Sequence, residues 1–176
     1  MILKKVLKLI TLISIIFYSN TSFSSESTYF VDMNFIMNNS LAGKSIKNQL
    51  NEKNKINNNN FKKTEEILKN EEAKLVSQKN LLNEVEYKKK IKLFQKKVSD
   101  YQDKRSNTFN ATSKMKEDAQ VSMVNTLTSI LSEYAEKNSI SYIIPKKSII
   151  IGKTELDLTN IILNILDTKV KDIKLK

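Results

Sequence analysis

The sequence predicts a mostly helical α+β protein in which a long antiparallel helical hairpin projects from a small three-stranded β part. Only two Gly and one Pro occur in 176 residues, and these residues are the usual breaks between elements. Residues 44–137 contain neither and are rich in Lys, Glu, Asn, Leu and Gln, which favours uninterrupted helix. Short aromatic and β-branched segments flank this region and indicate strands.

Two periodic patterns divide residues 44–137 into two helices. In the first, apolar residues recur every seven positions, at Phe61, Leu68, Leu75 and Leu82. In the second, steps of three and four residues run from Ile91 to Ala119, the 3.5-residue repeat of a helix packed along a partner. We expect the turn between them near residues 80–84. Residues 51–60 would then face residues 104–113, where apolar side chains are few and a run of Asn weakens the helix, so we expect a soft joint there.

The flanks predict three strands and a closing helix. The strands are expected at residues 28–32, 140–144 and 148–151, and an amphipathic helix at 160–166 with Thr159 as its N-cap. Together the flanks, residues 25–43 and 138–176, are roughly fifty residues, too few for a self-sufficient core. Open strand edges also need cover, so this β body is expected to oligomerise. Its expected contact residues are Tyr29, Val31, Tyr142, Ile143, Ile144 and Ile150.

Residues 1–24 have the pattern of a secretory signal peptide. Lys4, Lys5 and Lys8 accompany a short apolar stretch, and Ser22 and Ser24 place small residues before a cleavage site. The stretch is shorter than the about 20 residues that a membrane-spanning helix needs, although an uncleaved anchor is the alternative. Cleavage would leave 27 Lys and Arg against 19 Asp and Glu, a basic mature chain.

The composition argues against an enzyme. The chain has no His, the usual general base and metal ligand near neutral pH, and no Cys for a disulfide or thiolate site. Asp32 and Asp157 stand near strand ends, where they are expected to bond neighbouring backbone N–H groups. The segment 43–45 resembles the end of a phosphate-binding loop, but Asn38 stands where that loop needs Gly. We expect no catalytic residue, no metal and no cofactor.

The order of these segments resembles the Skp/OmpH family of periplasmic chaperones over essentially the whole mature length. The resemblance lies in Tyr-Phe-Val-Asp-Met at 29–33 with Asn-Ser-Leu-Ala-Gly-Lys at 39–44, in the segments 81–82, 88–91 and 94–98, and in the closing segments 142–146 and 156–159. It implies a homotrimer whose strands form one small barrel, with three hairpins as tentacles around a client cavity. It also implies a periplasmic protein that binds unfolded outer-membrane proteins without nucleotide. The run Asn57–Asn60 and the scarcity of Glu in the return helix depart from the family pattern and leave the client range open.

The candidate client-binding residues lie on the outer arm. Residues 44–105 hold 17 Lys and Arg against 9 Asp and Glu, so the basic excess is localised there. Such a face is often only a solvated helix surface, but converging arms would focus its field on an acidic client or anionic lipid. Apolar residues off the periodic seam would add binding surface for unfolded chains. The candidates are Ile67, Val76, Val85, Lys88, Lys89, Lys90, Lys92, Leu93, Lys96 and Lys97.

Three functions remain open on these grounds. The first is a chaperone that holds unfolded outer-membrane β-barrel proteins and prevents their aggregation without ATP. The second is a basic coiled-coil envelope protein that binds anionic lipid or lipopolysaccharide, or tethers membrane to wall. The third is a nucleic-acid-binding coiled coil, since basic helices bind phosphate backbones nonspecifically, but a signal peptide argues against it.

Overall fold

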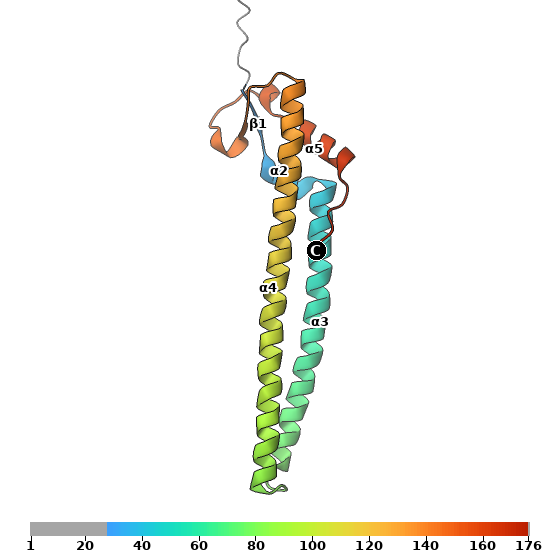
Figure 1. Ribbon diagram of the computed structural model, residues 1–176, viewed down its shortest axis with the longest axis vertical. Coiled ribbons are helices and arrows are strands. Elements are labelled where there is room, and N and C mark those ends of the chain that lie inside the picture. Colours follow the sequence, from blue (N-terminus) through green and yellow to red (C-terminus); the bar gives the residue numbers. More distant parts are fainter. Residues whose placement is uncertain (1–27, 176) are drawn as a thin grey trace, which may run out of the picture.

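The computed structural model describes residues 28–175, so the expected signal peptide at residues 1–24 lies outside the described residues. Two long helices run side by side as an arm, and the other elements gather at one end of it (Figure 1). At about 1.5 Å per residue, the longer helix spans about 80 Å. The elements are β1 (Thr28–Val31), α2 (Met33–Asn39), α3 (Leu41–Gln78), α4 (Glu84–Lys137), β2 (Tyr142–Pro145), two short 3-10 turns, η1 (Lys146–Ser148) and η2 (Thr154–Leu156), and α5 (Thr159–Lys169).

The predicted mostly helical class is confirmed, and the sheet has two strands. β1 and β2 pair in parallel, with Thr28 opposite Tyr142 and Val31 opposite Pro145. The other edge of β1 is covered by the chain before α5, where the Leu158 N–H donates to the Phe30 carbonyl at 2.9 Å. The far edge of β2 has no strand beside it among residues 28–175. No helix of the described chain is long and apolar enough to cross a membrane.

The third strand predicted at residues 148–151 is wrong. Its first residue ends η1, and the residues after it turn back in an irregular loop with Ile150 99% and Ile151 90% exposed. A strand needs a neighbour to bond, and among residues 28–175 no strand lies beside this segment. The loop instead approaches Phe30 so closely that a Cβ on Gly152 would lie 2.9 Å from the ring. Gly152 is therefore required by packing.

The sequence does not predict the short helix α2, because the predicted helical region begins at Lys44. Its N-terminus is capped by Asp32, whose carboxylate accepts from the Phe35 N–H at 2.9 Å. Ser40 then caps α3 by accepting from the Gly43 N–H at 3.1 Å. A Cβ on Gly43 would lie 1.7 Å from the Met37 carbonyl oxygen. Gly43 thus serves a tight junction between two helices.

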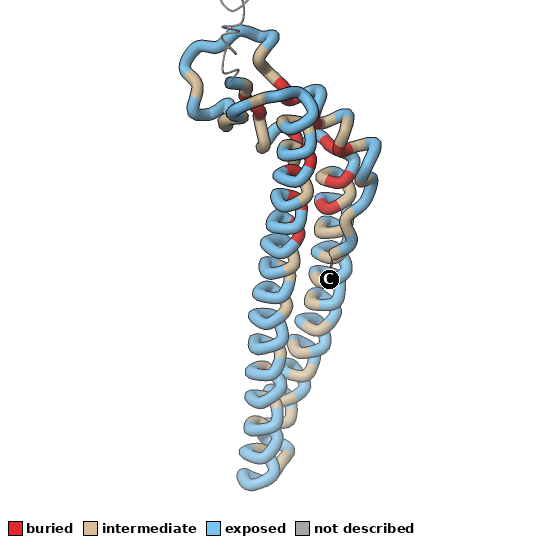
Figure 2. The backbone as a smooth tube through the Cα atoms, turned by 45° about the horizontal axis from the view of Figure 1, so that its top comes forward, coloured by how far each residue is buried: buried red, intermediate tan, exposed pale blue. Residues whose placement is uncertain are grey.

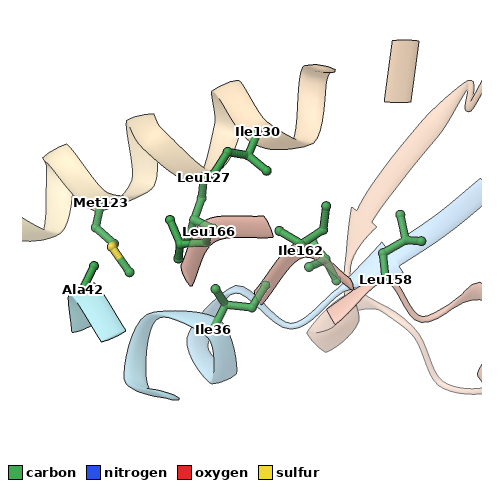
Figure 3. Close-up of a cluster of buried hydrophobic side chains, with 9 residues drawn as sticks. Ile36, Ala42, Met123, Leu127, Ile130, Leu158, Ile162 and Leu166 are labelled. Atoms are coloured by element: carbon green, nitrogen blue, oxygen red, sulfur yellow. The ribbon is translucent and has the colours of Figure 1, made fainter. Parts of the chain in front are cut away.

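Four helices and β1 meet in one apolar core at the base of the arm (Figure 3). Ile36, Leu127, Ile162 and Leu166 are fully buried there. The core extends into α4 well before residue 138, so the flanks do not have to bury an apolar cluster by themselves. Its buried members are Val31, Ile36, Ala42, Met123, Leu127, Ile130, Leu158, Ile162 and Leu166.

Thr159 is not the N-cap of α5, contrary to the prediction. Its hydroxyl oxygen accepts from the Asp32 N–H at 2.9 Å and so ties α5 to the end of β1. Leu158 stands at the N-cap position without a side-chain cap. Asp157, one residue earlier, accepts from the Thr159 N–H at 2.9 Å and pairs with Lys146 at 2.7 Å. Burial of the Asp157 carboxyl opposes ionisation, but hydrogen bonds from Lys146 and Thr159 outweigh it and hold its pKa below the usual value.

Packing in the arm is uneven along its length. Figure 2 shows buried residues at the body end and only intermediate ones along the facing sides of α3 and α4. Every side-chain hydrogen bond between the two helices lies beyond residue 60, toward the tip. Residues 50–60 make none to α4 within the described chain, and a groove of about 310 Å³ opens there, lined by Leu50, Asn54, Phe61, Phe109 and Thr112 among others.

We predict that the arm has a soft joint at this groove. Amides of residues 54–60 and 105–112 should exchange with deuterium well before those of residues 64–78 and 88–101, because little packing and no cross-helix hydrogen bond resists local opening there. Hydrogen exchange followed by mass spectrometry measures this directly. Equal protection along the arm would contradict the prediction.

Candidate functional site

The tip of the arm is a short turn that starts the lysine-rich helix at a defined residue. α3 ends at Gln78, and α4 begins at Glu84 after Asn83 caps it by accepting from the Glu86 N–H at 2.9 Å. Glu84 and Glu86 in the first turn place negative charge at the positive end of the helix dipole, which stabilises the start of α4. The turn therefore occupies residues 79–83, against an expected 80–84.

Between residues 50–60 and the tip, one polar and aromatic cluster joins the two helices. The Phe61 and Tyr101 rings meet edge to face with centroids 6.1 Å apart. Glu65 accepts from the Tyr101 hydroxyl and pairs with Arg105 at 2.8 Å, while the Arg105 guanidinium lies 5.8 Å from the Phe61 ring centroid. Partial burial and the Glu65 hydrogen bond raise the pKa of Tyr101. The cluster fixes the register of the outer arm.

Three of the six predicted binding lysines already form hydrogen bonds or ion pairs within the arm. Lys97 pairs with Glu71 at 2.7 Å, and Lys90 donates to the Gln78 side chain at 2.8 Å, so both join α4 to α3. Lys88 pairs with Glu84 at 2.5 Å along α4. Exposed pairs of this kind contribute roughly 0–1 kcal/mol each, but they hold these ammonium groups close to the arm.

The remaining candidates on α4 form one continuous face. Lys89, Lys92 and Lys96 make no side-chain hydrogen bond or ion pair within residues 28–175. With 3.6 residues per turn they lie on the side of α4 opposite the seam. Val85 and Leu93, 78% and 56% exposed, share that side. We call these five residues, Val85, Lys89, Lys92, Leu93 and Lys96, the basic tip face.

The two candidates on α3 do not join this face. Ile67 and Val76 are exposed, but they are nine residues apart, which places them on opposite flanks of the helix. The ten predicted residues therefore fall into three groups in the structure. Five form a continuous face on α4, three are lysines that bond within the arm, and two are isolated apolar side chains.

Comparison with known proteins identifies the family. The family model "Outer membrane protein (OmpH-like)" matches residues 27–166. This chain belongs to the OmpH-like family. A solved structure from Caulobacter crescentus CB15, described as a proposed outer membrane chaperone (OmpH-like), has a TM-score of 0.80 and 15% sequence identity, covering 86% of this chain and 89% of that one. At that identity the likeness concerns the fold alone. No curated protein matches the sequence.

In this OmpH-like protein the predicted contact residues of the body fall into two groups. Val31 is buried in the core of the same chain, and Tyr29 and Ile143 pack against that core. Ile144 is half-buried in β2. Tyr142 and Ile150 are 58% and 99% exposed, so of the six residues these two are free to contact a second molecule.

Of the exposed apolar side chains that sequence reasoning missed, three are the most exposed. Ile151 is 90% exposed beside Ile150, whereas the expected strand would have turned one of the two inward. Leu81 in the tip turn is 80% exposed and Phe109 at the groove is 72% exposed. Leu81 lies just before Leu82, the last residue of the seven-residue repeat, so the end of that pattern could have singled it out.

We predict that the basic tip face steers the capture of acidic unfolded chains. Replacing Lys89, Lys92 and Lys96 by Gln should lower the association rate and flatten its salt dependence, because screening shortens from about 8 Å at physiological ionic strength to about 3 Å at 1 M salt. Stopped-flow fluorescence with a labelled, urea-unfolded β-barrel protein measures both quantities.

The matched control replaces three lysines on α3, Lys55, Lys62 and Lys69, by Gln. These are also exposed and also lack a side-chain partner in the described chain, so the change in net charge is the same. An equal effect in both triple variants would assign the steering to net charge and contradict a role for the face.

Proposed function

We propose that this protein is a periplasmic chaperone that holds unfolded outer-membrane β-barrel proteins in solution without ATP. The observation that carries the proposal is the basic tip face. It presents three unpaired lysines and two exposed apolar side chains on the outer arm, far from the core. The two helices of the outer arm are joined there by side-chain hydrogen bonds. Membership of the OmpH-like family supports it. The described residues hold no cluster of His, Cys, Asp or Glu suited to a metal.

This surface suits a client without fixed structure. Lysines attract acidic segments at long range, and scattered apolar side chains make short-range contacts that need no particular sequence. Each contact is weak, but several arms acting together raise the effective concentration of the next contact. A soft joint near residues 54–60 would let the outer arm follow clients of different size.

The body supports assembly as a homotrimer. The open edge of β2 offers unpaired backbone groups. Tyr142 on that strand and Ile150 and Ile151 in the loop that follows η1 are exposed apolar side chains. Exposed edges and apolar patches of this kind are normally covered. Strands from three copies would close the edge as a small barrel and direct three arms to one side. Secretion through the expected signal peptide would deliver the chains to the periplasm.

The function is tested by aggregation. The mature protein, residues 25–176, should suppress light scattering when a urea-unfolded outer-membrane β-barrel protein is diluted into buffer, with the same result with and without ATP. The complex should elute as one species in size-exclusion chromatography with multi-angle scattering.

Two further samples separate this function from its alternative. The first sample contains anionic phospholipid vesicles and the second contains lipopolysaccharide. Sedimentation of the protein with either one would measure the binding expected of an envelope protein. Aggregation that proceeds unchanged, together with tight sedimentation on anionic vesicles, would overturn the chaperone proposal in favour of lipid binding or tethering.

We predict that a charge at Ile150 disrupts the oligomer. Ile150→Asp should shift the mass from trimer to monomer, because burying an unpaired carboxylate in a subunit contact is strongly unfavourable. Ile143→Asp is a poor probe, since Ile143 packs against the core of its own chain and its loss would also weaken the monomer.

Leu81→Asp at the tip is the matched control. Leu81 is 80% exposed and lies at the opposite end of the molecule, so this variant should remain trimeric. Circular dichroism should show unchanged helix content for both variants. A trimer that survives Ile150→Asp would place the assembly surface elsewhere.

A further inference from the structure

The C-terminal segment after α5 is bound to α3 as an extended peptide. The chain leaves α5 and descends beside the first turns of α3, where the C-terminus lies (Figure 1). Residues 170–175 form no helix or strand. Val170, Ile173 and Leu175 are half-buried while Lys171, Asp172 and Lys174 are exposed. In this segment, which we call the tail, polar and apolar residues alternate over 172–175, as they do in a β-strand.

One glutamine side chain holds the backbone of the tail. The Gln49 amide donates to the Ile173 carbonyl at 2.9 Å, and its oxygen accepts from the Leu175 N–H at 3.1 Å. A side-chain amide carries the donor and acceptor of a peptide group. Gln49 therefore bonds the tail as a neighbouring strand would, through atoms that every extended peptide presents.

A second set of contacts depends on the tail's own sequence. Ser45 donates to the Asp172 carboxylate at 2.5 Å, and Gln49 donates to the same oxygen at 3.1 Å. Ile173 packs against the apolar core. The site on α3 thus combines backbone recognition, an apolar contact and two donors for one acceptor. Main-chain hydrogen bonds that give affinity and pockets that give specificity are the general means of binding extended peptides.

We propose that this site, centred on Ser45 and Gln49, is a docking site for extended segments that alternate apolar and polar residues, and that the tail occupies it in the absence of such a segment. This rests on the proposed chaperone function, because strands of an unfolded β-barrel protein have that alternation. The tail shows that an extended strand-like peptide fits. A client strand would displace it and gain the Gln49 bonds and the apolar contact.

Locking the tail in place tests the proposal in the full-length mature chain. The sequence contains no Cys, so Ser45→Cys with Asp172→Cys introduces a single pair where the wild-type side-chain oxygens lie 2.5 Å apart. The probe is a fluorescein-labelled decapeptide that alternates Leu or Val with Thr or Asn, and its affinity is measured by fluorescence anisotropy. Oxidation should weaken binding about tenfold or more, since the competent open state is removed, and dithiothreitol should restore it.

The controls separate the site from general effects. Each single Cys variant should bind equally with and without dithiothreitol. A decapeptide of the same composition with its apolar residues in one block should bind weakly to every variant. Equal affinity for the alternating peptide in the oxidised and reduced double variant, with the disulfide verified by mass spectrometry, would overturn the proposal.

A second variant decides the question if the disulfide does not form. Asp172→Ala removes the sequence-specific hold on the tail and should tighten binding of the alternating peptide, while Asp103→Ala, an exposed carboxylate on α4, should leave it unchanged. In the Asp172→Ala background, where the tail competes less, Gln49→Ala should weaken binding and Gln102→Ala on α4 should not. No tightening by Asp172→Ala, or no loss with Gln49→Ala, would overturn the proposal.

These outcomes are distinct from a failure of the proposed function. Peptide binding that responds to the tail, without suppression of aggregation, would leave the docking site and remove the chaperone role. If the protein suppresses aggregation but its peptide binding does not respond to the tail, the chaperone role would stand and the docking site would be ruled out.

Discussion

The arm depends on the burial of a few apolar side chains at its base. Ile36 of α2, Leu127 of α4 and Ile162 and Leu166 of α5 are fully buried against one another's elements. Fully burying a side chain of this type contributes roughly 1.5–3 kcal/mol, and no comparable cluster exists along the rest of the described arm. The base is therefore the part of the fold that fixes the direction of α4. Everything toward the tip is held by half-buried side chains and a few ion pairs.

The outer and inner parts of the arm differ in how strongly their two helices are joined. Phe61, Glu65, Tyr101 and Arg105 form a cross-helix cluster that keeps the outer arm paired. Between that cluster and the core lies a segment with neither. The joint predicted at this segment would let the angle between the outer arm and the body vary while the outer surface stays the same. Both properties would serve the proposed chaperone function, because the contact surface would stay the same while the spacing of the arms adapts to the client.

The sequence predicted the helices well and the small elements less well, for identifiable reasons. A 3.5-residue repeat from Ile91 to Ala119 is a local property, so the packed side of α4 could be read directly. The role of Ile149–Ile151 depended on whether a neighbouring strand existed, and none does in the part of the chain that the structure describes. Thr159 has the composition of an N-cap, but its partner is the Asp32 N–H, far away in sequence. Likewise Lys90 and Lys97 differ from Lys89 and Lys96 only by the side of α4 on which they lie. Nothing local marked Gln49 as the residue that binds the tail.

The parallel pairing of β1 with β2 has a consequence for how the chain matures. Thr28 pairs with Tyr142, so the whole hairpin lies between two adjacent strands. The first strand leaves the membrane early if the chain is exported from its N-terminus, yet its partner follows only after both long helices have emerged. Helices form from local contacts, whereas this sheet must close a very long loop. The helical hairpin can therefore form before β1 pairs with β2. During that stage a newly exported chain would carry β1 with unpaired edges, which is the kind of surface that chaperones protect.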